Sequence, residues 1–326
     1  TKKVIPFSDG VQKSVEALSS QAAVAITNKN LIKDLEVLFE SFIKLIASAI
    51  DAKSPYTGGH CSRVPEITMM LAESVNDINE GPFAGIQFTD KEMYELKIAA
   101  WLHDCGKVAT PEAVVDKGTK LETIYDRIHT VATRFEVLKR DEEIKFLKKQ
   151  LKIQKDNSLS ENEKKDALKK ARSLYLKRIK QQGDDKAFIE ESNVGGEFMS
   201  KDRKDRVKKI ASYRWRDNGS PKPFFTEDEV YNLCISRGTL TPEERKIIND
   251  HIVVTIDMLE QLPYPKHLRN VPEFAGGHHE KLDGTGYPKG LNHSEMSVQA
   301  KIMAIADIFE ALTACDRPYK KGKTLS

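Results

Sequence analysis

Apolar side chains recur every three or four residues along most of the chain, the spacing that places them on one face of an α-helix. Residues 11–50 carry two such stripes, separated by a polar stretch at 27–30. The second stripe, from Leu31 to Ala49, stays close to the 3.5-residue repeat of a coiled-coil seam. An ordinary core helix has a similar pattern, but we favour a signalling helix that forms a homodimer with a second copy of the chain.

Several later helices are predicted by capping boxes, in which a Ser or Thr and an acid three residues later satisfy each other's backbone groups. These pairs are Thr89 with Glu92, Ser160 with Glu163, Thr226 with Glu229, and Thr241 with Glu244. With the apolar periodicity they predict helices over residues 60–71, 90–101, 112–115, 124–151, 160–183, 201–216, 241–259 and 298–314, and loops at 195–196 and 218–221. The expected fold class is all-α.

Residues 119–235 differ from their surroundings in composition. They combine narrow apolar seams with many Lys and Glu residues and show no pattern typical of catalysis. We predict an antiparallel helical hairpin, inserted as a protruding arm. This arm would gate a site or contact a partner such as a signalling protein, and would not form a second catalytic domain.

Composition restricts the function classes. With 39% hydrophobic and 31% charged residues, the 326-residue chain has the balance of a helix-rich globular protein. A net charge of only +3 gives no support to a nucleic-acid binder. The four cysteines lack metal-ligand spacing, which favours free thiols in a reducing compartment. No apolar run is long enough for a membrane helix, so we expect a cytoplasmic location, while an anchor in a part not present here stays open.

Two stretches are rich in chemically active side chains. Residues 278–284 are His-His-Glu-Lys-Leu-Asp-Gly, followed by Thr-Gly-Tyr-Pro. Imidazoles suit Mn, Fe, Zn or Ni, and the glycines with the proline favour a rigid turn. The second stretch, His103-Asp104-Cys105-Gly106-Lys107, ends a helix apolar enough to be buried. Burying an unpaired Asp or Lys costs about several kcal/mol, so an ion pair or a metal is expected there.

Further ligand types lie at helical positions elsewhere in the chain. His60 opens a predicted helix, His251 falls on or beside an apolar face, and Asp307 stands within an apolar run. Each alone is more often structural, since a single His or Asp on a helix needs no metal. The collected candidates are His60, His103, Asp104, Lys107, His251, His278, His279, Asp283 and Asp307.

In chain order these residues form the pattern His…His-Asp-x-Gly-Lys…His…His-His-Glu-x-x-Asp-Gly-x-Gly-Tyr-Pro…Asp, which resembles the HD-GYP branch of the HD phosphohydrolase superfamily. The resemblance implies an HD-type helical bundle around a metal centre that hydrolyses a bacterial cyclic dinucleotide, either cyclic di-GMP or a cyclic GMP-AMP. The segment 11–50 also resembles the last helix of a GAF sensor domain and its linker. The expected parts are an upstream sensor end with the signalling helix, the HD-GYP domain in two pieces, and the inserted arm, at residues 1–40, 41–118 with 236–326, and 119–235.

The resemblance also implies roles for individual residues. Two divalent ions are expected, Fe or Mn, with Ni, Zn and Mg as alternatives. One ion would take His60, His103, Asp104 and Asp307; the other would share Asp104 and take His251, His278 and His279. Lys107 would stabilise charge on the phosphate or protonate the leaving group. The turn behind the paired histidines would be fixed by Asp283, Gly284, Gly286, Tyr287 and Pro288, while Arg317 and Lys320 match family positions that contact substrate phosphate.

Two function classes stay open: an active metallophosphodiesterase, and a weak or inactive domain that acts as a dinucleotide receptor or signalling module. The complete ligand set favours the enzyme, since a receptor would be free to lose ligands.

Some family members carry a Glu four residues before the first ligand His and resemble three-metal enzymes, whereas this chain has Tyr56 there. A phenol with a pKa of about 10 is a poor ligand at neutral pH. We therefore expect two ions, a linear dinucleotide as main product, and Tyr56 packed over the pocket or bonded to substrate.

Overall fold

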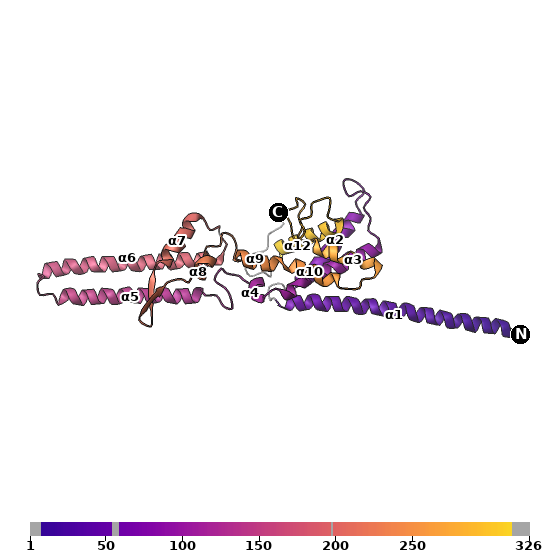
Figure 1. The fold of residues 1–326 in the computed structure, drawn as a ribbon, viewed down its shortest axis with the longest axis horizontal. Coiled ribbons are helices and arrows are strands. Elements are labelled where there is room, and N and C mark those ends of the chain that lie inside the picture. The colour runs from indigo at the N-terminus through magenta and orange to yellow at the C-terminus, as the bar shows by residue number, and fades with distance from the viewer. Residues whose placement is uncertain (1–7, 54–58, 197, 315–326) are drawn as a thin grey trace, which may run out of the picture. The chain divides into compact units, whose positions relative to one another are not determined.

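Residues 8–53, 59–196 and 198–314 are described by the structure, a computed structural model (Figure 1). Contacts divide these residues into two units. Unit 1 contains the described residues up to Ala109 and those from His251 onward, and unit 2 contains the described residues of Thr110–Asp250. Within the described ranges the only sheet has two strands, so the predicted all-α fold class is confirmed. None of the helices described there is both long and apolar enough to cross a lipid bilayer.

Unit 1 is a helical bundle built along the C-terminal half of the long helix α1 (Figure 1). The apolar residues of α1 divide accordingly, because Ile43, Ala47 and Ile50 are buried in the bundle while Leu31 and Leu38 are exposed. The helices of this unit are α1 (Asp9–Lys53), α2 (His60–Asn76), α3 (Asp90–Leu102), η1 (Cys105–Ala109), α10 (His251–Glu260), η2 (Lys266–Leu268), α11 (Val271–Gly276) and α12 (Val298–Thr313).

Unit 2 has its own apolar core, in which Phe135 of α5, Ile189 of α6 and Phe224 meet. Helices α5 and α6 lie side by side and form the predicted helical hairpin (Figure 1). The elements of this unit are α4 (Glu112–Val115), α5 (Ile128–Gln154), α6 (Glu161–Val194), α7 (Lys201–Ala211), β1 (Arg214–Asp217), β2 (Ser220–Pro223), α8 (Glu227–Leu233) and α9 (Pro242–Asn249).

The four predicted capping boxes are all present. In each, the Ser or Thr hydroxyl accepts a hydrogen bond from the backbone N–H three residues on, and the acid at that position accepts one in return. They start α3, α6, α8 and α9. Local sequence therefore determined where these helices begin.

Several predicted boundaries differ from the structure, most clearly in α6, in α7 and between α9 and α10. Helix α6 continues through Gly183 to Val194, because its last turns bury Phe188 and Ile189, which outweighs the roughly 1 kcal/mol cost of a helical glycine. The helix expected over 201–216 ends at Ala211, and a β-hairpin follows where a loop was expected. The helix predicted over 241–259 is interrupted at Asp250 and becomes α9 and α10.

The β-hairpin had a readable signal. Asn218 and Gly219 both adopt positive φ, 48° and 81°, as the two central residues of a tight hairpin turn do. Arg214 pairs with Pro223 across the two strands, and Trp215 donates its indole N–H to the Pro223 carbonyl. Asn-Gly is the strongest short-range hairpin signal in a sequence. Few alternating apolar residues flank it here, so the sequence pattern favoured a helix up to residue 216 and a loop after it.

Unit 2 extends beyond the predicted arm of 119–235 at both ends. Its outer segments join through the buried Lys117, whose ammonium lies 2.8 Å from both Glu244 carboxylate oxygens and 2.8 Å from the Asn232 side-chain oxygen. Short helices α4 and α9 also contact each other. The four-part division of the chain stays a prediction.

Candidate metal centre

The seven predicted metal ligands meet at one place in unit 1. All except His279 and Asp307 are buried, and those two are partly exposed. Five separate elements deliver them: His60 begins α2, His103 and Asp104 follow α3, His251 begins α10, His278 and His279 follow α11, and Asp307 lies on α12.

The ligand atoms form two principal groups. His60, His103 and Asp307 each offer one atom within 4.8 Å of the others, and so do His251, His278 and His279. These groups correspond to the two ligand sets that the family resemblance implies, without their shared carboxylate.

Asp104 lies between the two groups. Its Oδ2 is 3.2 Å from both His60 Nε2 and His103 Nε2, whereas its Oδ1 is 3.3 Å from His251 Nε2. One carboxylate oxygen therefore faces each group, as a carboxylate that bridges two cations requires. The ammonium of Lys107 lies 2.5 Å from Oδ2, and 24% of the Lys107 side-chain surface is accessible to solvent.

Two histidines are each oriented by a hydrogen bond to the backbone carbonyl three residues earlier in the chain. His103 Nδ1 donates to the carbonyl of Ala100 at 2.7 Å, and His278 Nδ1 donates to that of Ala275 at 2.6 Å. Each acceptor lies in the last turn of α3 or α11, where carbonyls have no helical partner. With the proton on Nδ1, the Nε2 lone pair is directed into the centre.

His60 is oriented differently, by a carboxylate that sequence analysis did not assign to the site. Glu310 is 2% exposed, and its Oε2 lies 2.5 Å from His60 Nδ1. Its other oxygen accepts from Arg63 Nε at 2.8 Å and Nη2 at 2.5 Å. The available signal was its position three residues after Asp307 in an otherwise apolar helix, which places both acids on one face.

Burial and neighbouring charges set the protonation of the centre. Burial lowers the pKa of His278 to about 4 and that of His279 to about 2, so both imidazoles are neutral at pH 7. Burial also opposes the charge of Asp104, but Lys107 and His103 outweigh it and hold the carboxyl pKa well below its usual range. For His60, hydrogen bonds to Asp104 and Glu310 outweigh burial and raise the pKa to about 9.

A metal fits these residues because three buried atoms of the centre make no hydrogen bond to any residue that the structure describes. They are His103 Nε2, His278 Nε2 and Asp104 Oδ1. An unsatisfied buried polar atom costs about 1–3 kcal/mol. All three are lone-pair donors of one cluster, and a cation between the two groups would satisfy them together.

Close backbone packing brings η1 against α10. A Cβ on Gly106 would lie 2.0 Å from the His251 carbonyl oxygen and 2.5 Å from the Thr255 nitrogen. The Gly106 N–H instead donates to Thr255 Oγ1 at 2.9 Å. The glycine between Asp104 and Lys107 is thus what allows His251 to approach Asp104.

The turn after the paired histidines is held chiefly by Glu280, which sequence analysis did not single out. Its buried carboxylate accepts from the backbone N–H groups of Lys289 at 2.7 Å and Leu291 at 2.9 Å. A Cβ on Gly286 would lie 2.5 Å from the Glu280 Cα, so only glycine fits there. The signal was the acid directly after His278-His279.

The other predicted turn residues lie in the same segment. Asp283 is exposed and accepts from the N–H and hydroxyl of Thr285, so its bonds stay within the turn. Gly284 has a φ of +76°, and the Tyr287–Pro288 peptide bond is cis. The Tyr287 ring stacks on His279, with centroids 4.8 Å apart. The predicted substrate contacts Arg317 and Lys320, and Tyr56, lie outside the described residues.

Comparison with known proteins finds one kind of domain in this chain. Two family models, both described as an HD domain, match residues 57–185 and 225–326, together more than half of the chain. The chain belongs to the HD-domain family. The HD-domain match at 57–185 begins just before His60 and contains His103 and Asp104. The second match contains the other four candidate ligands.

Curated relatives match over shorter ranges. The chain is 42% identical over 92 residues to 3'3'-cGAMP-specific phosphodiesterase 3 of Vibrio cholerae, a match covering 28% of this chain and 19% of the relative. It is 39% identical over 93 residues to a cyclic di-GMP phosphodiesterase of Thermotoga maritima, covering 28% of this chain and 25% of the relative. The matches thus span a fifth to a quarter of these relatives.

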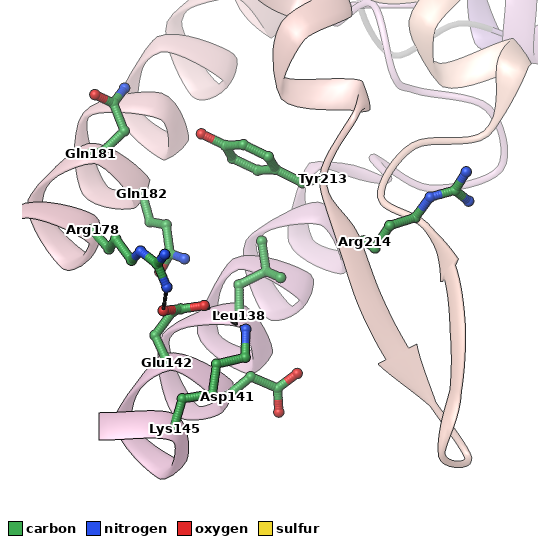
Figure 2. Close-up of a pocket in the computed structure, with 9 residues that line it drawn as sticks. All are labelled: Leu138, Asp141, Glu142, Lys145, Arg178, Gln181, Gln182, Tyr213 and Arg214. Atoms are coloured by element: carbon green, nitrogen blue, oxygen red, sulfur yellow. Dashed lines mark hydrogen bonds and ion pairs between the residues drawn. The ribbon is translucent and has the colours of Figure 1, made fainter. Parts of the chain in front are cut away.

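Unit 2 contains a separate cavity of about 250 Å³ between α5, α6 and the start of β1 (Figure 2). Its charged wall is largely paired internally, because Glu142 accepts from Arg178 at 2.7 Å and from Lys145 at 2.6 Å. None of the predicted site residues that the structure describes lines it. The cavity is therefore explained as a polar groove of the helical hairpin.

Proposed function

We propose that this HD-domain protein is a metal-dependent phosphodiesterase that hydrolyses a bacterial cyclic dinucleotide. The observation that carries the proposal is the convergence of seven ligands from five elements, with the Asp104 carboxylate between two groups. The names of the relatives, specific for 3'3'-cGAMP or cyclic di-GMP, supply the substrate class.

Two divalent ions would be held by the two groups. His60, His103 and Asp307 would hold one, His251, His278 and His279 the other, and Asp104 would serve both. Imidazole-rich sets with few carboxylates suit Fe or Mn. When bound, the ions supply positive charge that lowers the pKa of water and neutralises phosphate oxygens.

Lys107 would act on the substrate side of the centre. The charge of Asp104 outweighs burial and raises the pKa of its ammonium, so it is cationic at neutral pH. Since part of the Lys107 side chain is accessible to solvent, we infer that its Nζ would contact a phosphate that enters the site. It would stabilise charge on a non-bridging oxygen or give a proton to the leaving oxygen.

The number of ions is proposed as two. Asp51 is the nearest described acid before His60, and both of its carboxylate oxygens already accept backbone N–H groups, from Gly59 and Cys61. A third ion would have to compete with those bonds. With less positive charge to hold a doubly charged terminal phosphate, the site would release a linear dinucleotide as its main product.

The test is hydrolysis by the purified chain loaded with Mn²⁺ or Fe²⁺. Cyclic di-GMP and 3'3'-cGAMP are supplied separately, and products are identified by chromatography. We expect a linear dinucleotide from at least one substrate, and none from Asp104→Ala. Tight binding of a dinucleotide without hydrolysis by the fully loaded protein would favour the receptor role instead.

The exposed stripe of α1 supports the proposed homodimer. Its members are each more than half exposed although they follow the spacing of a seam: Leu31, Leu35, Leu38, Phe42 and Leu45. Leu38→Lys combined with Leu45→Lys should lower the molar mass at sedimentation equilibrium from dimer to monomer. Val37→Lys, an exposed apolar residue outside the stripe, is the matched control, and an unchanged dimer in the double variant would contradict the seam.

A further inference from the structure

The last turn of α1 contacts the segment that begins with His60. Asp51 Oδ2 accepts from the backbone N–H of Gly59 at 3.1 Å, and its Oδ1 accepts from that of Cys61 at 3.3 Å. Helix α2 has Gly59 at its N-cap, so no side chain caps it locally. Asp51 supplies that cap from another helix and thereby holds the backbone on both sides of His60.

The same turn also contacts the segment that carries Lys107. Lys53 Nζ donates to the carbonyl of Lys107 at 3.1 Å and to that of Val108 at 2.7 Å. These carbonyls lie toward the end of η1, where a cation is favourable because the last carbonyls carry partial negative charge. Lys53 thus fixes the segment that directly follows His103 and Asp104.

These two contacts differ from ordinary packing in what they join. Ile43, Ala47 and Ile50 already bury this part of α1 in the core. Asp51 and Lys53, two residues apart, add directional bonds to the two segments that carry His60 and Lys107. A movement of α1 along or about its axis would therefore displace both segments, and catalytic constellations tolerate shifts of only about 0.5 Å.

We propose that Asp51 and Lys53 are positioning residues through which α1 sets the geometry of the metal centre. The inference rests on the proposed metal centre but not on the identity of the substrate. The exposed stripe upstream on α1 gives the helix a place where a second copy can change its position, and the last turn carries that change to His60 and Lys107.

The first test measures Mn²⁺ affinity of the full chain by competition with a chromophoric chelator. Asp51→Asn and Lys53→Met should each weaken binding about 10- to 100-fold, the usual effect of losing a group that orients a ligand. Asp34→Asn and Lys33→Met, exposed residues on the same helix, are the matched controls and should bind as the unaltered chain does. Asp51→Glu should recover part of the loss.

Thermal unfolding of the metal-free variants separates positioning from a structural role. A merely structural contact would lower the melting temperature and leave the Mn²⁺ affinity of the folded protein within about twofold. That result in both variants would overturn the proposal. Normal Mn²⁺ responses without hydrolysis of any cyclic dinucleotide would overturn the proposed function and leave this inference standing.

The second test addresses transmission. Two residues inserted after Lys29 rotate the upstream part of α1 by about 200°, whereas seven residues nearly restore its phase. The two-residue insertion should change Mn²⁺ affinity, and the seven-residue insertion should not. In a chain that already carries Asp51→Asn and Lys53→Met, the two-residue insertion should have no further effect, and an effect of the same size in both backgrounds would refute transmission through these residues.

Discussion

Glu310→Gln should weaken metal binding without unfolding the protein. The Glu310 carboxylate lies 2.5 Å from His60 Nδ1, and Glu310 is only 2% exposed, so solvent does not replace the bond. A buried hydrogen bond to a charged group contributes about 1.5–3 kcal/mol, which corresponds to roughly 10- to 150-fold in affinity. The amide retains the shape of the side chain but no longer carries the charge that orients His60. Competition titration with Mn²⁺ measures the loss directly.

Arg63→Met is the matched control, because Arg63 binds the same carboxylate through its other oxygen. It leaves the bond between Glu310 and His60 in place, so we expect a smaller loss of affinity than from Glu310→Gln. Equal losses in both variants would mean that the whole ion pair stabilises the fold and that Glu310 has no particular role toward His60. Unchanged Mn²⁺ affinity in Glu310→Gln would refute the reasoning outright.

Further predictions concern the rest of the centre and the arm. Asp104→Ala should abolish hydrolysis and metal content together in elemental analysis, since one carboxylate faces both groups; retained turnover would exclude the bridge. Gly106→Ala should lower the free energy of unfolding by about 1–3 kcal/mol in denaturant titrations, because its Cβ would overlap the His251 carbonyl. The pKa of His60, raised to about 9, means that a metal must displace its proton, so Mn²⁺ affinity should rise by up to about tenfold per pH unit from pH 7 to 9; a flat profile would contradict this. Replacing residues 122–232 by a Gly/Ser linker should leave Mn²⁺ affinity intact, and collapse of both folding and metal binding would make the arm part of the core.

The sequence by itself determined the local structure of this protein well. Capping boxes such as Thr89 with Glu92 located helix starts because their bonds span only three residues. The candidate ligands could also be selected from the sequence, since imidazoles and carboxylates in apolar helical surroundings are costly without a partner. Local patterns could not predict helix boundaries that depend on tertiary contacts. Helix α6 continues through Gly183, for example, because the core contacts of Phe188 outweigh the low helix propensity of glycine.

Only the tertiary structure decided how the ligands are held. Glu310 lies 250 residues from His60 in the chain, and Asp51 acts from the end of α1, so no spacing rule connects either of them to the site. Glu280, unlike the exposed Asp283, is buried and spans the turn after the paired histidines. A sequence states which groups can bind a metal, because that is a property of each side chain. Which groups orient them depends on where burial removes water and leaves one partner within hydrogen-bond reach, and that is fixed only when the helices pack.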